Sequence, residues 1–350
     1  MNILILGGTQ FSGRAFTQLA VDANHSVTLL HRSKEDPGLP AAVRRLVGDR
    51  DPLLAEQGGD GLKLIKELLD AGEHFDAVVD MCGYTPRVTK AACDLLKDHT
   101  DLYIFISTIS VYDIPNADAI ADVILDEDGP KITLDDPTVE EVTGETYGGL
   151  KVLCEQVVIE AFPDSHCIPR PCVIAGPNDP TDRVTWWSRM LITQESLIIP
   201  ADSAGLASFI DARDLAAFFL HCAANKTTGI FNATGPEPEL SLHDFIYRTH
   251  AALDSKTKLI ELSQAKLEEL NIQAWHDIPT WLPSDKQYMH KITSAKARAA
   301  GLVNRPLEET MIAIRDWDFE RGSPELKAGM KPDRIAEILD QLNQAPSTKD

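Results

Sequence analysis

Two acid–base side chains, Tyr147 and Lys151, stand four positions apart in the sequence Tyr-Gly-Gly-Leu-Lys. In a helix this spacing places both side chains on one face. A phenol with a pKa of about 10 is a poor acid–base at neutral pH, but a neighbouring ammonium favours the phenolate and lowers that pKa. The pair therefore predicts proton transfer at a substrate oxygen. Gly148 and Gly149 are poor helix formers, and they predict that another group, such as a cofactor ribose, approaches this helix closely.

A hydroxyl group completes the candidate catalytic set. The apolar run before Ser107 predicts a strand, and Thr108 follows at its carboxyl end. A hydroxyl at this place can hydrogen-bond the substrate oxygen while that oxygen gains or loses charge. We therefore predict that Thr108, Tyr147 and Lys151 are the catalytic residues.

A glycine-rich turn follows the first apolar run and predicts a dinucleotide site. Gly7 permits a tight turn, Gly8 and Thr9 bring backbone N–H groups toward a pyrophosphate, and Gly13 lets the next helix pack closely. The helix N-terminus adds unpaired N–H groups. Gln10 occupies a position where the usual spacing has glycine, and its side chain either narrows the approach or adds an amide donor. The predicted cofactor contacts here are Gly7, Gly8, Thr9, Gln10, Phe11 and Gly13.

The end of the second predicted strand bears on the choice of cofactor. An NAD site usually ends this strand with an acid that accepts hydrogen bonds from the ribose, but His31 stands here. Arg32 can grip a 2′-phosphate bidentately, and Ser33 and Lys34 can add a donor and a charge. We therefore expect NADP to be preferred over NAD, although an exposed basic turn is the alternative. Asp49, after the third strand, is expected to contact the adenine.

The elements that must position these residues alternate short β-rich runs with helical patterns, which is typical of a parallel sheet. The predicted fold is α/β, a Rossmann-type doubly wound parallel sheet with a smaller C-terminal substrate subdomain. We predict a dinucleotide-binding domain over 1–177, to which the chain returns near 208–235. A mainly substrate-binding subdomain is expected over 178–320, and a C-terminal helix and tail over 321–350. The strands of the first domain are predicted at 2–6, 26–30, 43–47, 77–80, 102–107 and 167–174.

Substrate contacts are expected after the sixth strand. Arg183 can bind an anionic group, and Trp186 and Trp187 can stack on a ring, although packing of both tryptophans in the core is the alternative. Another aromatic group, Trp275, His276 and Trp281, can line the same cleft or pack in the core. The long acidic segment 113–146 is either a flap over the substrate or a solvated excursion.

Composition sets limits on the partners. The 350-residue chain has a formal net charge of -21, which argues against nucleic acid as the main partner. Its six cysteines form no pattern with zinc spacing, and we expect no metal. No secretory signal or membrane-spanning stretch is recognisable. We therefore expect a cytoplasmic protein that acts on a small molecule, and the sequence leaves a homodimer open.

Taken in order, these motifs resemble those of the extended short-chain dehydrogenase/reductases, the NAD-dependent epimerase/dehydratase family. The resemblance covers roughly residues 2–320. It rests on the glycine turn, the strand-end hydroxyls and the Tyr/Lys pair, together with the segments 170–177, 209–215, 230–235 and 301–306. It implies that Thr108 is a hydroxyl donor, Tyr147 the acid–base and Lys151 a ribose-binding cation. It also implies that Pro171 and Val173 lie beside the nicotinamide, and we add Cys82 to the expected cofactor contacts.

The resemblance leaves two functions open. The first is an NAD(P)-dependent oxidoreductase or epimerase that transfers hydride at a hydroxyl or carbonyl carbon of a small, sugar-nucleotide-like substrate. The alternative is a non-catalytic dinucleotide sensor or an RNA-binding atypical relative, because the Gln10 departure is similar to atypical branches of the family. Sugar-nucleotide dehydratases of the family carry an Asp-Glu pair after the strand-end threonine, where this chain has Ile109 and Ser110. The resemblance therefore argues against that subclass, and the choice between epimerase and reductase stays open.

Overall fold

The chain folds around one large parallel sheet. The computed structural model describes residues 1–344 except 36–37, 55–59, 114–123, 202–204, 206, 237, 284–285 and 287–290, so the predicted tail 345–350 lies outside the described residues. Seven strands follow the order β10-β6-β5-β4-β1-β2-β3, and every neighbouring pair is parallel. Their bounds are β1 Asn2–Leu6, β2 Ser26–His31, β3 Arg44–Val47, β4 Ala77–Asp80, β5 Tyr103–Phe105, β6 His166–Pro171 and β10 Gly229–Ala233. The predicted Rossmann-type α/β fold is confirmed.

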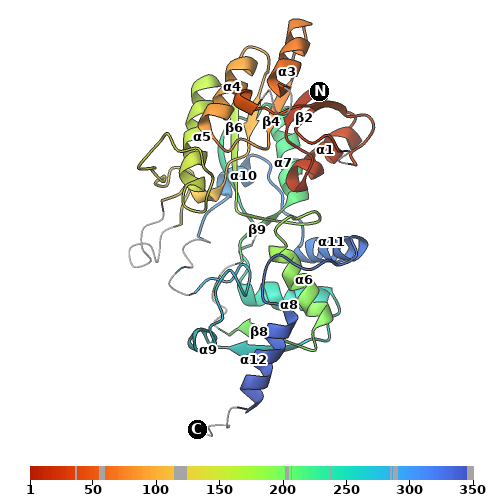
Figure 1. Ribbon diagram of the computed structural model, residues 1–350, viewed down its shortest axis with the longest axis vertical. Helices are drawn as coiled ribbons and strands as arrows, with labels where there is room; N and C mark the ends of the chain where they lie inside the picture. The colour runs from red at the N-terminus through yellow and green to blue at the C-terminus, as the bar shows by residue number, and fades with distance from the viewer. Residues whose placement is uncertain are drawn as a thin grey trace.

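Helices cover both faces of this sheet (Figure 1). The helices α1 (Phe11–Asp22) and α7 (Ala212–Asn225) pack together on one face. The helices α3 (Gly61–Asp70), α4 (Pro86–Leu96) and α5 (Tyr147–Ala161) cover the other. Strand β1 shows why both faces are apolar, because Ile3 and Ile5 join the core under α1 and α7 while Leu4 and Leu6 join the opposite core. A strand that is buried on both faces needs such a continuous apolar run.

The order of the strands reverses beside β1. The chain proceeds from β1 to β2 and β3 on one side, and then crosses to β4, β5, β6 and β10 on the other. In open α/β sheets the ligand crevice lies at this switch point, outside the carboxyl ends of the strands. The glycine turn follows β1 and Thr108 follows β5, so the topology brings both predicted motifs to one edge of the sheet.

The sixth predicted strand, 167–174, is divided in two. β6 ends at Pro171, and β7 (Val173–Ala175) leaves the large sheet to pair with β9 (Phe209–Asp211). Pro169 and Pro171 have no backbone N–H and cannot donate to a continuous ladder, which favours a break here.

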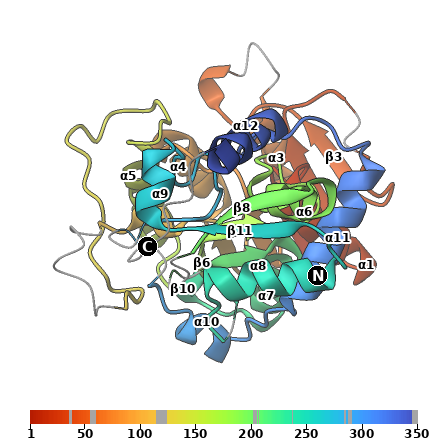
Figure 2. The same cartoon turned by 90° about the horizontal axis from the view of Figure 1, so that it is seen from below.

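The second half of the chain builds a separate apolar core. β8 (Ser196–Pro200) pairs with β11 (Lys258–Leu262) in a small parallel sheet. The core beside it contains buried side chains of α6 (Arg183–Thr193), α8 (Leu242–Ala252), α11 (Leu307–Glu320) and α12 (Pro332–Gln344). Figure 2 views this part from below, with β8, β11, α8 and α12 in front of the large sheet. The short helix α9 (Gln264–Glu269) adds Leu267 to this core, whereas α10 (Ala295–Ala299) packs against β10 of the large sheet.

The described part of the acidic segment, residues 124–146, is attached to the fold. Ile132 donates its backbone N–H to the carbonyl of Val111 at 2.8 Å. Leu125 donates to the carbonyl of Lys291 at 2.9 Å. These bonds anchor the segment beside the start of α5, whereas residues 114–123 lie outside the described part of the chain.

Within the described ranges, no helix is long and apolar enough to cross a membrane. Among the same residues, no group of three or more His, Cys, Asp or Glu side chains is arranged to hold a metal ion.

Candidate active site

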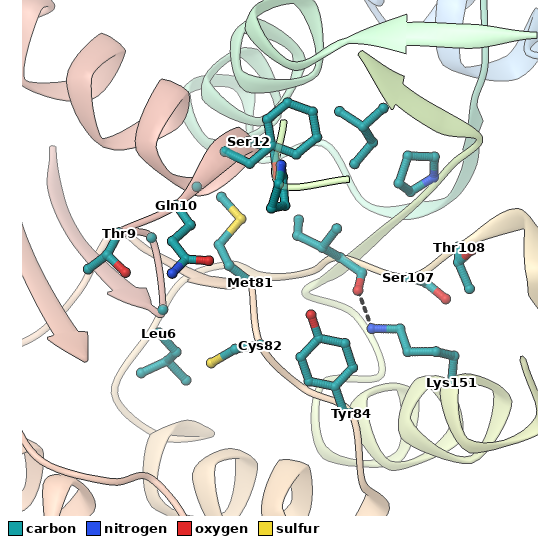
Figure 3. Close-up of a pocket in the computed structure, with 18 of the residues that line it drawn as sticks. Leu6, Thr9, Gln10, Ser12, Met81, Cys82, Tyr84, Ser107, Thr108 and Lys151 are labelled. Carbon is teal, nitrogen blue, oxygen red and sulfur yellow. Dashed lines mark hydrogen bonds between the residues drawn. The ribbon is translucent and has the colours of Figure 1, made fainter. Parts of the chain in front are cut away.

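A cavity of about 980 Å³ opens at the carboxyl ends of the strands. Its lining joins segments that are far apart in the sequence, including the glycine turn, the end of β2, the loop after β4 and the start of α5. Figure 3 shows Thr9, Gln10 and Ser12 on one side of this cavity and Thr108 and Lys151 on the other. The predicted dinucleotide turn and the predicted catalytic residues therefore line a single cavity.

The glycine turn has the shape of a phosphate cradle. Gly7 adopts φ +95°, which favours glycine. A Cβ atom on Gly8 would lie 2.7 Å from the side chain of Ile5, and one on Gly13 would lie 2.6 Å from the Cα of Gly8. Gln10 precedes α1 but makes no side-chain capping bond, so the first N–H groups of the helix are not taken up by that side chain. These residues fit a pyrophosphate at the helix N-terminus.

Lys151 is buried and holds its ammonium against the backbone. Its Nζ donates to the carbonyl oxygen of Gly83 at 2.9 Å and also to that of Ile106. The same atom lies 4.1 Å from the ring centroid of Phe105. Burial lowers the pKa of Lys151 to about 8, because an ammonium loses hydration in this position.

Tyr147 and Thr108 both line the cavity, and the phenol is hydrogen-bonded to Thr108. Burial raises the pKa of Tyr147, while the bond from Thr108 and the positive charge of Arg183 act in the opposite direction. The sequence predicted that Lys151 would lower this pKa. In the structure the ammonium faces the carbonyls of Gly83 and Ile106 instead, and the opposing cation is Arg183.

A buried network holds the strand-end hydroxyls in place. The hydroxyl of Ser107 donates to Glu155 at 2.5 Å. The guanidinium of Arg170 binds both carboxylate oxygens of Glu155, at 2.8 and 2.6 Å, and donates to the hydroxyl of Tyr112 at 2.9 Å. Ser107 is therefore committed to the network, whereas the Oγ1 of Thr108 bonds to its near neighbour Ser110 and reaches the cavity beside Tyr147.

The two glycines of α5 serve protein packing. A Cβ atom on Gly148 would lie 2.2 Å from the backbone oxygen of Ser110, and one on Gly149 would lie 2.4 Å from Leu134. The prediction that another group approaches this helix closely is confirmed, but the group is the chain itself and not a cofactor ribose, because Ser110 and Leu134 occupy the space. Leu134 belongs to the acidic segment, so this contact arises only after the segment has folded back on the helix.

The end of β2 supplies a polar wall of the cavity. Arg32 and Ser33 line it, but Lys34 is not among the lining residues. His31 is only 7% exposed, and neither ring nitrogen has a hydrogen-bond partner among the described residues. Burial and the nearby Arg45 lower the pKa of His31, so the ring is neutral at pH 7.

A buried ion pair lies beside the predicted adenine contact, and no motif in the sequence indicates this pair. Asp49 lines the cavity, and its carboxylate accepts the N–H of Asp51 at 2.8 Å. The next residue, Arg50, forms a bidentate pair with the buried Asp80, with Nη2 2.9 Å from Oδ2. Tyr103 donates to the same carboxylate at 2.9 Å. The pair connects the loop after β3 to the end of β4, past β1 and β2, so only the tertiary structure brings these residues together.

The predicted substrate residues fall into two groups. Arg183 lines the cavity, and its guanidinium lies 6.0 Å from the ring centroid of Trp275, which also lines it. Trp186 and Trp187 do not reach the cavity. They are 1% and 0% exposed, and their indole N–H groups donate to the carbonyls of Met330 and Pro279.

The stacking role predicted for Trp186 and Trp187 is therefore corrected, since both rings are core side chains with satisfied N–H groups. Trp281 is also buried in this core, whereas His276 is exposed. Helical spacing alone does not predict this outcome, because positions three and four residues after Arg183 lie on the same side of α6 as Arg183. Arg183 is the first residue of the helix and borders the cavity, whereas Met330 and Pro279, which are distant in the sequence, cover the two tryptophans.

The remaining predicted cofactor residues, Cys82, Pro171 and Val173, all line the cavity. Sequence reasoning missed most of the loop after β4. The residues of that loop and of the following helix that line the cavity are Met81, Tyr84, Thr85 and Val88. Their position directly after a buried parallel strand was the available signal.

Among curated relatives, the chain is similar to the chloroplast stem-loop binding protein of 41 kDa b from Arabidopsis thaliana. The two are 25% identical over 245 residues, which is 67% of this chain. The match spans 58% of the length of that relative.

Solved structures share the fold at low sequence identity. A UDP-glucuronic acid 4-epimerase from Bacillus cereus, in complex with NAD, superposes with a TM-score of 0.61 at 17% identity, covering 92% of this chain and 98% of the other. A UDP-glucose 4-epimerase from Thermotoga maritima gives a TM-score of 0.64 at 12% identity, covering 93% and 100%. The model of the NAD dependent epimerase/dehydratase family matches residues 3–234, which hold the glycine turn, Thr108, Tyr147 and Lys151. The chain belongs to the NAD dependent epimerase/dehydratase family.

Proposed function

We propose that the protein is an NAD(P)-dependent oxidoreductase or epimerase that transfers hydride at a hydroxyl or carbonyl carbon of a small, sugar-nucleotide-like substrate. The observation that supports this most is the convergence of Thr108, Tyr147 and Lys151 on the cavity that also holds the glycine turn. A glycine turn alone fits any nucleotide-binding protein, but a phenol, a hydroxyl and a buried ammonium at one centre fit proton transfer during redox chemistry.

A bound nicotinamide would supply the hydride acceptor or donor, with the pyrophosphate at the glycine turn. Tyr147 would exchange the proton of the reacting hydroxyl, and Thr108 would hydrogen-bond the same oxygen as its charge changes. The hydrogen bond from Thr108 and the charge of Arg183 both favour the phenolate that this role requires. Lys151 would contribute a fixed positive charge below its pKa of about 8. Arg183 would also bind an anionic group of the substrate.

The test is cofactor turnover against a panel of sugar nucleotides and small carbonyl compounds. We expect Tyr147→Phe to lower kcat by about 10²–10⁴-fold, because one acid–base group is lost. The affinity for the dinucleotide should stay nearly unchanged. Turnover of the variant at the wild-type rate would remove Tyr147 from the mechanism.

We further propose that NADP is preferred over NAD. Arg32 and Ser33 line the cavity at the end of β2, and no acidic residue stands at that strand end. Arg32→Ala should weaken NADPH binding by about 1.5–3 kcal/mol, the value of charge-assisted hydrogen bonds, and should leave NADH binding nearly unchanged. Titration of both cofactors into both proteins measures this preference. Tighter binding of NADH by the wild type would contradict it and would leave the neutral ring of His31 as the ribose contact.

A further inference from the structure

We infer that Tyr84 is a substrate-binding residue whose hydroxyl donates a hydrogen bond to an oxygen on the carbon next to the reacting carbon. The inference deepens the proposed function, because it takes Tyr147 as the group that meets the reacting oxygen. It assigns the site to substrates with two neighbouring oxygens, such as a vicinal diol or a hydroxyketone.

Tyr84 is placed beside the reacting centre by a rigid connection. Gly83 has no side chain, and its backbone passes close to β5, because a Cβ atom there would lie 2.5 Å from the ring of Phe105. The carbonyl of Gly83 accepts the hydrogen bond from Lys151, so the backbone is tied to the catalytic ammonium. Helix α4 then begins at Pro86, directly after Thr85. Tyr84 therefore lies between two fixed points.

The side chain of Tyr84 faces the catalytic residues. The ammonium of Lys151 lies 5.6 Å from its ring centroid. Figure 3 shows the ring in the space between Cys82 and Lys151, and the hydroxyl points away from the backbone into the cavity. Tyr147 is close enough to raise the pKa of Tyr84 electrostatically. The two phenols therefore border the same part of the cavity.

The hydroxyl of Tyr84 is available to a ligand. The residue is 47% exposed and lines the cavity, and no described residue hydrogen-bonds its hydroxyl. The surrounding walls of the cavity remove part of the hydration of the phenol and raise its pKa, so the hydroxyl keeps its proton and remains a donor. When a ligand displaces water from this part of the cavity, the hydroxyl of Tyr84 needs a hydrogen-bond acceptor, and an oxygen of the ligand provides it. Because Tyr147 takes the reacting oxygen, that partner is another oxygen of the same substrate.

The first experiment crosses two proteins with two probes. 2,3-Butanedione and 2-butanone differ by one oxygen on the carbon next to the reacting carbonyl. We expect Tyr84→Phe to lower the preference of kcat/KM for the diketone by about 2- to 10-fold relative to wild type, which is the value of one hydrogen bond. The intrinsic reactivity of the diketone cancels in this double cycle.

The second experiment needs no turnover. 2,3-Butanediol and 2-butanol are titrated into the protein loaded with NADPH. Because NADPH is already reduced, it cannot oxidise these alcohols, and their binding is followed by the fluorescence of the nicotinamide. The ratio of the two dissociation constants should change by the same factor in Tyr84→Phe. Tyr247→Phe is the matched control, because it removes the hydroxyl of a tyrosine on the surface of α8, and that hydroxyl binds Glu261 of β11. In this control the ratio of the two dissociation constants should stay at the wild-type value.

The outcomes separate the inference from the proposed function. A change below about 2-fold in both experiments, or no binding of either alcohol, overturns the role of Tyr84. A loss of NADPH affinity without a change in either ratio assigns the hydroxyl to the cofactor and overturns it as well. A changed binding ratio without turnover by the wild type supports Tyr84 and contradicts the proposed function. Turnover by the wild type without a changed ratio supports the proposed function and contradicts the role of Tyr84. Failure of the wild type to bind NADPH contradicts the role of Tyr84 and the proposed function alike.

Discussion

At the scale of single residues, burial changes the pKa of Lys151 and with it the charge that this side chain brings to the site. The ammonium has two backbone carbonyls as partners, yet burial still lowers its pKa to about 8 from an ordinary value of 10.5. At pH values between about 8 and 10.5, Lys151 carries a proton in the unfolded chain that it has released in the folded chain. The free energy of unfolding therefore rises with pH across this range.

This sign gives a prediction for Lys151→Met, which removes the titrating group and keeps an apolar side chain of similar length. From pH 7 to about pH 9.5 the wild type should gain about 2 kcal/mol of stability relative to the variant. Urea unfolding of both proteins at the two pH values measures the gain. A difference that does not change with pH would mean that the carbonyl bonds keep Lys151 charged.

At the scale of elements, the start of α5 is fixed by the chain that precedes it. Gly148 lies against the backbone oxygen of Ser110, which belongs to the loop that carries Thr108. Since Tyr147 and Lys151 begin this helix, its distance from the loop sets the spacing of the predicted catalytic groups. A helix–loop contact therefore controls the geometry that the proposed reaction needs.

Gly148→Ala tests this contact. Alanine is the better helix former by about 1 kcal/mol, so propensity alone would stabilise the variant. The added methyl group would instead meet a backbone oxygen 2.2 Å away, and we expect a net loss of about 1–3 kcal/mol in unfolding free energy together with a lower kcat. Gly144→Ala is the control, because nothing lies within 4 Å of its added Cβ atom. Equal stability of the two variants would show that the loop gives way.

At the scale of the whole molecule, charge separates the enzyme from the RNA-binding alternative. Phosphate binding by release of counterions needs clustered Lys and Arg. This chain has 33 basic and 54 acidic residues. We expect no gel-shift complex with a stem-loop RNA at about 10 μM protein and about 50 mM salt, where non-specific binders already associate. A salt-sensitive complex at this concentration would favour the alternative, and binding of NADPH by the same sample serves as the control.

Local sequence determined the parts of this protein that depend on neighbours along the chain. The glycine turn after β1, the Tyr/Lys spacing on α5 and the alternation of strands and helices follow from backbone freedom, helical periodicity and the burial of apolar runs. The order of these motifs was sufficient for the Rossmann-type fold and for the family.

Tertiary structure decided which side chains share a surface. It placed Trp186 and Trp187 in the core, filled the space at Gly148 and Gly149 with the chain itself, and brought Tyr84 to Lys151. Each of these outcomes depends on contacts between segments that are distant in the sequence. Periodicity shows that a residue is buried or exposed, but the packing partner is set by the sheet order and by the path of the connecting loops.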